Sequence, residues 1–143
     1  MRQQQQGEPR STTWIYPVKR EQGETKYKTF YSEAAQSEVS YLLYLLTDYN
    51  NSPERRYPVV YWLDGVPGRQ TACEALAVPL DQAIREGKAP AMIVVGVNGI
   101  DLGFYCDSKD GQWPVETVIV KDLIAHIDKT YRTVARRKGR AVE

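Results

Sequence analysis

Apolar residues recur along the chain with two different periods, which predict strands in some segments and helices in others. Lys26–Ser32 alternates polar and aromatic residues, as a half-buried strand does, and Ser40–Leu46 is a second, more apolar strand candidate. The intervening EAAQSE predicts a turn that makes the pair an antiparallel hairpin. Tyr57–Leu63 and Ala91–Val97 are nearly free of polar side chains, which is typical of central strands covered on both faces.

Two further segments carry apolar residues at helical spacing. The first is predicted to end near Glu86, with Gly87 just past its end, and Pro79 suits its first turn, while Thr71 and Glu74 have the spacing of a capping box. Its apolar stripe comprises Leu76, Leu80, Ala83 and Ile84. The second helix is opened by Pro114, and its apolar positions are Ile119, Leu123 and Ile127, with Val120, Ile124 and Tyr131 beside them.

The order of these elements predicts the fold class. A hairpin is followed by strand, helix, strand, helix and, after the basic loop ARRKGR, the first residues of another strand at Ala141–Glu143. Strands joined by helical crossovers pair in parallel, with right-handed connections and helices on both faces. We therefore expect a three-layer α/β sandwich whose sheet is mostly parallel, with an N-terminal antiparallel hairpin.

Length and composition agree with one globular α/β domain. The chain has 143 residues, and its 19 basic and 18 acidic side chains nearly cancel to a net charge of +1, which argues against a dedicated binder of nucleic acid or of membrane surfaces. We expect residues 1–25 to form a polar, partly disordered leader with a small apolar island at Trp14–Val18, and residues 26–143 to form the domain.

No segment of the sequence reads as a membrane helix or as an export signal. No apolar run approaches about 20 residues, and MRQQQQGEPR lacks the hydrophobic segment of a signal peptide. We expect a soluble protein, cytoplasmic, or secreted if the true N-terminus lies upstream. Cys73 and Cys106 have no metal-like spacing, so free thiols are predicted, although one disulfide stays open.

Candidate chemistry lies in the loops that leave the carboxyl ends of the two buried strands, where open α/β sheets bind ligands. These loops are Asp64–Gln70 and Asn98–Gly111. A glycine-bearing loop at this edge can hold an anion on its backbone N–H groups, but DGVPG fits neither phosphate-binding pattern. Gly65 and Gly68 therefore either serve an oxyanion site or only permit the turn, and spacing alone leaves both readings open.

From about Thr29 to Glu143 the chain resembles the putative-esterase family of the α/β-hydrolase fold, which includes feruloyl and acetyl-xylan-type esterases, esterase D-like enzymes and mycolyltransferase-like relatives. The resemblance rests on the order and spacing of YPVVYWLDGVPG, AMIVVGVNG, FYCDS, ETVIVKDLIAHIDKTYRT and RAVE. It implies a serine esterase acting on a small-molecule ester, without metal or organic cofactor and without nucleic-acid or membrane partners.

The resemblance also implies roles for individual positions. The backbone at Gly65 and Val66 becomes a candidate oxyanion hole, with the N–H of Val66 as donor and Gly65 allowing close approach. Asp64, Tyr105 and Asp107 become candidate substrate-binding residues, the last two in the wall of the acyl or alcohol pocket. The nucleophile elbow would directly follow a strand of the type RAVE. Since the triad order in this fold is serine, acid and histidine, all three catalytic residues would lie beyond Glu143.

Asp64 stands where the family usually has histidine. A carboxylate beside an oxyanion hole opposes the negative charge that develops there, unless it turns away or is neutralised. The other reading is an aspartate that caps its own loop by accepting backbone N–H groups. Two further departures are Leu46, where proline is common, and Ala125, where proline commonly precedes the position of His126.

No residue inside the chain is expected to replace the triad. His126, the single histidine, lies two residues from Asp128 on a predicted helix, so the two side chains should point to different faces, and a structural or surface role is predicted. Ser108 lacks a base and is predicted to bond within its loop. The basic cluster is predicted to be a solvated surface; it comprises Arg132, Arg136, Arg137, Lys138 and Arg140.

Two hypotheses from different classes follow. The first is the N-terminal part of a serine carboxylic-ester hydrolase, inactive by itself. The second is a non-catalytic α/β domain that self-associates or binds a partner through an exposed sheet edge next to Tyr57–Leu63. A flavodoxin-like nucleotide or flavin binder is disfavoured, because no loop has the expected phosphate signature.

Overall fold

The computed structural model describes residues 13–17, 24–65, 69–101 and 103–143. One mixed sheet has the strand order β1-β2-β4-β3-β5. β2 is antiparallel to both of its neighbours, whereas β3 is parallel to β4 and to β5. Four of the five strands therefore run in the same direction, which confirms the mostly parallel sheet with its N-terminal hairpin. The strands are β1 (Thr25–Ser32), β2 (Ser37–Tyr44), β3 (Val59–Trp62), β4 (Ile93–Val97) and β5 (Arg140–Val142).

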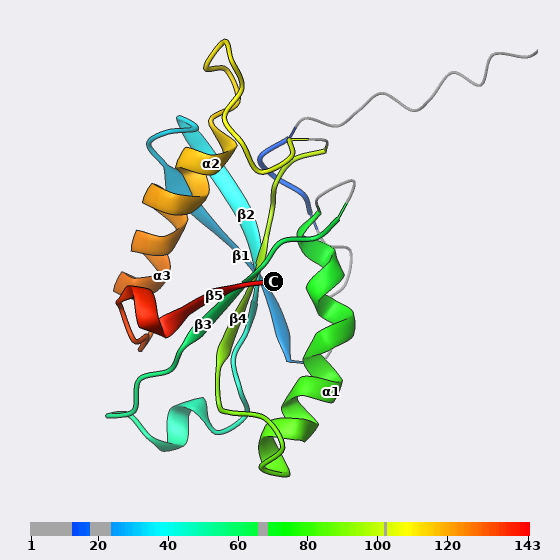
Figure 1. Ribbon diagram of the computed structural model, residues 1–143, viewed down its shortest axis with the longest axis vertical. Helices are drawn as coiled ribbons and strands as arrows, with labels where there is room; N and C mark the ends of the chain where they lie inside the picture. The colour runs from blue at the N-terminus through cyan, green and yellow to red at the C-terminus, as the bar shows by residue number, and fades with distance from the viewer. Residues whose placement is uncertain (1–12, 18–23, 66–68, 102) are drawn as a thin grey trace, which may run out of the picture.

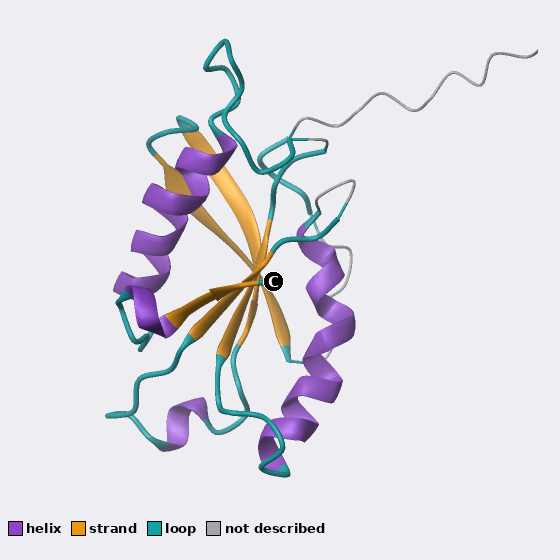
Figure 2. Ribbon diagram, in the orientation of Figure 1, coloured by secondary structure: helices purple, strands orange, loops and turns teal. Residues whose placement is uncertain are grey.

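Helices cover both faces of this sheet, so the predicted three-layer sandwich is confirmed (Figures 1 and 2). On one side lies α1 (Glu74–Arg85). On the other lies one helical segment made of α2 (Val115–Thr117), a π-helical stretch (Val118–Leu123) and α3 (Ile124–Thr130). Short 3-10 turns occupy Tyr49–Asn51, Gln70–Cys73 and Arg137–Gly139. None of the helices in the described ranges is long and apolar enough to cross a membrane.

The hairpin turn is tighter than the sequence predicted. β2 begins at Ser37 rather than Ser40, because Ser37 and Glu38 pair with the last residues of β1. The turn is also tied to the neighbouring helical layer, since the Asp122 carboxylate accepts the Ser32 hydroxyl at 2.6 Å and the Ala34 N–H at 2.9 Å. These bonds at the turn favour the shorter connection.

The start of the first helix also differs from the prediction. Thr71 lies in the 3-10 turn that precedes α1, and no side chain caps the helix, so the capping box is not formed. Pro79 lies inside α1 rather than in its first turn, on the solvent side, because the helix already begins at Glu74. The predicted end is confirmed, since Gly87 follows the helix in the left-handed region at φ +70°.

The second helical segment buries the predicted stripe of Ile119, Leu123 and Ile127. Val120, however, is 56% exposed, and Val118 fills the core with 1% exposure. A π-helical stretch makes a wider turn than an α-helix, so positions within it rotate relative to the even helical spacing assumed from the sequence.

The basic cluster is only partly a solvated surface. Arg132 lies over the Tyr49 ring at 3.9 Å and bonds to the Tyr49 carbonyl, and Arg140 is paired with Asp128. Both guanidinium groups therefore join the segment after α3 to the body of the domain. The other three members are exposed, as predicted: Arg136, Arg137 and Lys138.

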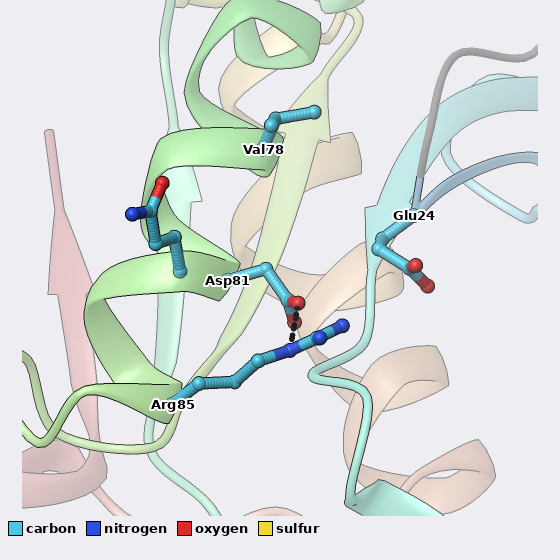
Figure 3. Close-up of a pocket in the computed structure, with 5 residues that line it drawn as sticks. Glu24, Val78, Asp81 and Arg85 are labelled. Carbon is cyan, nitrogen blue, oxygen red and sulfur yellow. Dashed lines mark ion pairs between the residues drawn. The ribbon is translucent and has the colours of Figure 1, made fainter.

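A buried carboxylate fastens α1 to the end of β2. Asp81 is 6% exposed and accepts the Tyr44 hydroxyl at 2.9 Å, the Thr47 hydroxyl at 2.9 Å and the Thr47 N–H at 3.2 Å, and Arg85 lies at 2.7 Å (Figure 3). Burial would raise the pKa of Asp81, but the hydrogen bonds from Thr47 and Tyr44, with the charge of Arg85, outweigh it and lower this pKa. The group stays ionised and satisfied.

Asp81→Ala should lower the free energy of unfolding by about 2 kcal/mol, because the buried Tyr44 hydroxyl and the Thr47 amide lose their acceptor. The Arg85 side chain is 56% exposed, so loss of its ion pair should add little. Urea denaturation measures the change. Gln82→Ala, at the exposed neighbouring position, is the matched control and should change stability by less than about 0.5 kcal/mol. Equal effects of the two substitutions would contradict this account of Asp81.

His126 lies between the helical layer and the hairpin, and its structural role is confirmed. Its Nε2 is 3.0 Å from the Tyr41 hydroxyl, and its ring stacks on Phe30 with centroids 5.1 Å apart. Tyr131 contacts the same hydroxyl at 3.4 Å. Burial lowers the pKa of His126, and the charge of Glu38 opposes this only in part. The folded chain therefore favours the neutral imidazole.

Stability should fall in mild acid because of this histidine. The lowered pKa means that its stabilising contribution is fully present above the unfolded value of about 6.5 and is lost as the pH falls through the folded value, since the unfolded chain takes up the proton first. His126→Gln, which keeps a polar partner for Tyr41, should flatten the decline in unfolding free energy between pH 7 and pH 5. Identical pH profiles of the two proteins would refute this linkage.

Candidate functional site

The loops that leave the carboxyl ends of β3 and β4 lie against each other. The Tyr105 hydroxyl, from the loop after β4, donates a hydrogen bond of 2.8 Å to the backbone carbonyl of Asp64, which follows β3. Because β3 and β4 are parallel, their carboxyl ends reach the same edge of the sheet, where ligands bind in folds of this class. The two segments that the sequence singled out therefore form one site.

A second contact joins the same two loops. Arg69 and Asp101 form a bidentate pair, with Nε–Oδ1 and Nη2–Oδ2 distances of 3.0 Å each. The Asp101 side chain is 10% exposed, and the Arg69 guanidinium also lies 5.0 Å from the centre of the Tyr16 ring. Asp64 and Arg69 stand on either side of the glycine-bearing turn, so both of its ends are held.

The loop after β4 has an unusual backbone. Ile100, Phe104 and Tyr105 have φ angles of +52°, +51° and +53°, a region that side-chain-bearing residues rarely adopt. Backbone strain of this kind persists only where surrounding contacts impose it, and it gathers at functional sites. Gly99 allows one of these contacts, because a Cβ there would lie 2.3 Å from the Tyr105 ring.

A hollow of about 260 Å³ opens in this loop. Its lining is largely apolar, and Phe104 is 69% exposed beside it. The side chains that line it include Ile100, Phe104, Cys106, Ser108, Trp113 and Val115. A second hollow, of about 350 Å³, lies around Asp81 and Arg85 (Figure 3). Asp81 bonds to Tyr44, which pairs with Val94 near the start of β4, so this hollow lies at the amino-terminal end of the parallel strands. The smaller hollow is therefore in the position expected of a ligand site.

The segment 13–17 packs against this edge of the domain. Trp14 is 8% exposed, and its ring lies 6.0 Å from that of Trp113, which lines the hollow. Its carbonyl accepts the Ser40 N–H at 2.8 Å and the Asn98 side chain at 3.0 Å. Gln70 completes the attachment, donating to the Tyr16 carbonyl at 2.9 Å and accepting the Ser40 hydroxyl at 2.7 Å.

The sequence does not predict that the residues bonded to segment 13–17 come together. Ser40, Gln70 and Asn98 are each at most 4% exposed, but they come from three segments that are distant in sequence, so no local pattern reveals that they meet. Gln70 offered the one signal, since it is a polar residue between the glycine-bearing turn and a predicted helix.

Gly65 lies at the open side of the site. It is exposed, and no described atom comes within 4 Å of the position its Cβ would occupy. Its N–H also has no acceptor among the described residues. Val66 and Gly68, the other positions of interest in this turn, lie outside the described residues.

The two predicted acidic residues differ in their surroundings. The half-buried Asp64 carboxylate accepts no hydrogen bond from the described part of the chain, and the residues 66–68 that it would cap lie outside that part. Asp107 accepts the Thr117 hydroxyl at 2.6 Å and the Thr117 N–H at 2.9 Å, and these bonds lower its pKa. Asp107 thus fastens the loop to α2, and it is absent from the lining of the hollow.

No triad forms among the described residues. Ser108 donates to Asp110 at 2.6 Å and accepts the Trp113 N–H, as predicted for a residue bonded within its loop. His126 contacts Tyr41 rather than a nucleophile, and Asp128 bonds to Thr133 and Arg140. In the ranges that the structure describes, no three His, Cys, Asp or Glu side chains gather as metal ligands would, and Cys73 and Cys106 are free thiols.

Solved structures show where this fold occurs elsewhere. A ferulic acid esterase is 24% identical with a TM-score of 0.73, over 86% of this chain and 49% of that one. A ferulic acid esterase from Anaeromyces mucronatus, solved with ferulic acid, is 20% identical with a TM-score of 0.64, over 90% and 51%. An S-formylglutathione hydrolase from Agrobacterium tumefaciens is 17% identical with a TM-score of 0.61, over 82% and 47%. These likenesses establish an α/β-hydrolase-like fold.

The chain spans about half the length of the solved structures that it matches. A comparison with curated proteins gave no match. The family model "Esterase: Putative esterase" matches residues 32–142, from the end of β1 to the end of β5. The match thus includes both loops of the candidate site, and the chain belongs to this esterase family.

Proposed function

We propose that this chain is the N-terminal, oxyanion-binding part of a serine carboxylic-ester hydrolase. The observation that carries the proposal is the N–H of the exposed Gly65, which has no acceptor among the described residues and lies at the carboxyl edge of the sheet of an esterase-family chain. An ester carbonyl under attack needs such donors, fixed in advance at about 2.7–3.1 Å from its oxygen. Gly65 and the adjacent Val66 are the backbone donors that we assign.

The position of β5 supports the rest of the assignment. β5 is parallel to β3, and the Glu143 carbonyl accepts the Leu63 N–H at 2.8 Å. Any polypeptide that continues from Glu143 therefore starts at the carboxyl edge of the sheet, beside Leu63, the residue before Asp64. In α/β-hydrolases the nucleophilic serine sits on a sharp turn after such a strand. We propose that serine, acid and histidine all follow Glu143 in the complete enzyme.

In that enzyme the serine oxygen attacks the ester carbonyl while the histidine takes its proton, and the alcohol leaves after the histidine returns the proton to it. The resulting acyl-enzyme is then hydrolysed by water. This chain supplies backbone donors for the oxyanion in both tetrahedral intermediates, and the N–H after the serine supplies another.

The substrate class follows from the hollow beside the site. Phe104 and Trp113 offer aromatic surface there, and Trp14 packs behind Trp113. Such a lining suits an apolar or aromatic acyl group better than a charged one. Two of the similar structures are ferulic acid esterases, which agrees with a feruloyl ester, and a smaller acyl group such as acetyl also fits this chemistry.

Two proteins test the proposal: the 143-residue chain and the product of the reading frame extended beyond Glu143. The extended protein should hydrolyse p-nitrophenyl acetate and react with a fluorophosphonate probe, whereas the 143-residue chain should do neither above the level of a heat-denatured control. A titratable ester-hydrolysing site in the 143-residue chain would contradict the proposal that the catalytic triad follows Glu143. An extension that lacks a serine turn of the type Gly-x-Ser-x-Gly would contradict it as well.

We propose as a second function that the chain by itself associates with another copy through β5. In the described ranges β5 pairs with β3 alone, and Val142 is 66% exposed on it. Next to this edge three buried polar atoms lack a hydrogen-bond partner within the described residues: the Tyr61 hydroxyl, Trp62 Nε1 and Arg140 Nε. Unpaired strand edges and unsatisfied buried donors are features that association relieves.

Size-exclusion chromatography with light scattering should show concentration-dependent oligomers of the 143-residue chain. Val142→Lys should shift them toward monomer, because a charge on an edge strand opposes strand addition. Val120→Lys adds the same charge at an exposed site on the helical layer, away from β5, and should leave the oligomers unchanged. A monomer at all concentrations would rule this function out.

A further inference from the structure

The Tyr105 hydroxyl has a defined and specific partner. It donates to the Asp64 carbonyl at 2.8 Å, and no reversal of this bond exists, because a carbonyl oxygen can only accept. The ring is seated against Gly99, where any Cβ would approach it to 2.3 Å. The backbone of Tyr105 also keeps a φ of +53°. Both the ring and the hydroxyl are thus held in place.

The Tyr105–Asp64 bond also determines the direction of the Gly65 N–H. In a planar trans peptide the C=O of one residue and the N–H of the next point in opposite directions. The carbonyl of Asp64 and the N–H of Gly65 belong to one such peptide. When Tyr105 holds the carbonyl on one side, the Gly65 N–H must point to the other, and no described residue accepts it.

A glycine at position 65 makes such control necessary. Without a Cβ, the residue has more accessible backbone conformations than any other, so its peptide is not oriented by local sterics. The Arg69–Asp101 pair holds the far end of the turn but contacts neither atom of the Asp64–Gly65 peptide. Among the described residues Tyr105 alone bonds to that peptide through a side chain.

We propose that Tyr105 is a positioning residue for the oxyanion site: its hydroxyl fixes the Asp64–Gly65 peptide plane so that the Gly65 N–H points at the ester oxygen. The inference rests on the proposed function, in which this N–H is a donor. Tyr105 does not touch the reacting atoms in this scheme, and it is absent from the lining of the hollow. This role differs from that of a pocket wall, which the family resemblance suggested for it.

The protonation state of Tyr105 agrees with this role. Burial, followed by the nearby charge of Asp64, raises its pKa to about 12. The hydroxyl therefore keeps its proton across the pH range in which esters are assayed, and the donor is always present.

Tyr105→Phe tests the inference, since it keeps the ring against Gly99 and removes only the hydroxyl. In the extended enzyme, kcat for p-nitrophenyl acetate should fall by about 10- to 100-fold with KM changed by less than about twofold, because a misdirected donor weakens transition-state stabilisation and leaves ground-state binding intact. A raised KM with an unchanged kcat would instead identify a pocket-wall residue and overturn the proposal. Tyr31→Phe is the matched control, because Tyr31 is 53% exposed on β1.

A second measurement separates failure of this inference from failure of the proposed function. In the 143-residue chain, ¹⁵N NMR of Tyr105→Phe should show a changed Gly65 amide resonance and faster averaging of its orientation, with the rest of the spectrum retained. An unchanged Gly65 amide would overturn the positioning role even if no ester is hydrolysed. A changed amide together with an extended wild-type protein that hydrolyses no ester would instead refute the esterase function.

Discussion

The parallel pairing of β3 with β4 on one side and with β5 on the other is the constraint on which the rest of the structure depends. Parallel strands deliver all their carboxyl ends to one edge of the sheet. That edge receives the glycine-bearing turn after β3, the strained loop after β4 and, beside Leu63, the backbone of Glu143. Antiparallel pairing in either position would place one of these segments at the opposite end of the domain. The site thus follows from the topology before any side chain contributes.

Side chains then reduce the freedom of the two loops. Tyr105 bonds to the backbone on one side of the turn and Arg69 binds Asp101 on the other, while Asp107 fastens the loop after β4 to α2. Segment 13–17 is attached beside them by buried amides and a hydroxyl. Each of these contacts joins segments that are far apart in sequence. The proposed oxyanion site, which would present backbone N–H groups to a ligand, depends on such support, since the N–H groups themselves contribute no packing.

The strands, the helices and the edge that carries the site could be predicted because they depend on local patterns and general topology rules. Val59 and Ile93 are 0% exposed, as expected of apolar runs covered on both faces. The errors have equally physical causes. Val120 is exposed rather than part of the apolar face, because a π-helical stretch alters the helical period. Arg132 is not a solvated side chain, because it makes a cation–π contact with Tyr49, more than 80 positions earlier in the sequence. The joint role of Ser40, Gln70 and Asn98 in attaching segment 13–17 could not be predicted, since hydrogen bonds between distant segments leave no periodic signal in the sequence.

Asp64, which occupies the position where the family usually has histidine, shows why the site tolerates this departure. The bond that the structure forms at this position uses the backbone carbonyl of residue 64, which is the same for any side chain. A histidine there would leave the Tyr105 bond and the peptide plane as they are. The carboxylate adds a negative charge, which acts in the same direction as the larger effect of burial and raises the pKa of Tyr105. The orientation of the Asp64–Gly65 peptide is therefore set through the backbone and Tyr105, independently of the side chain at position 64.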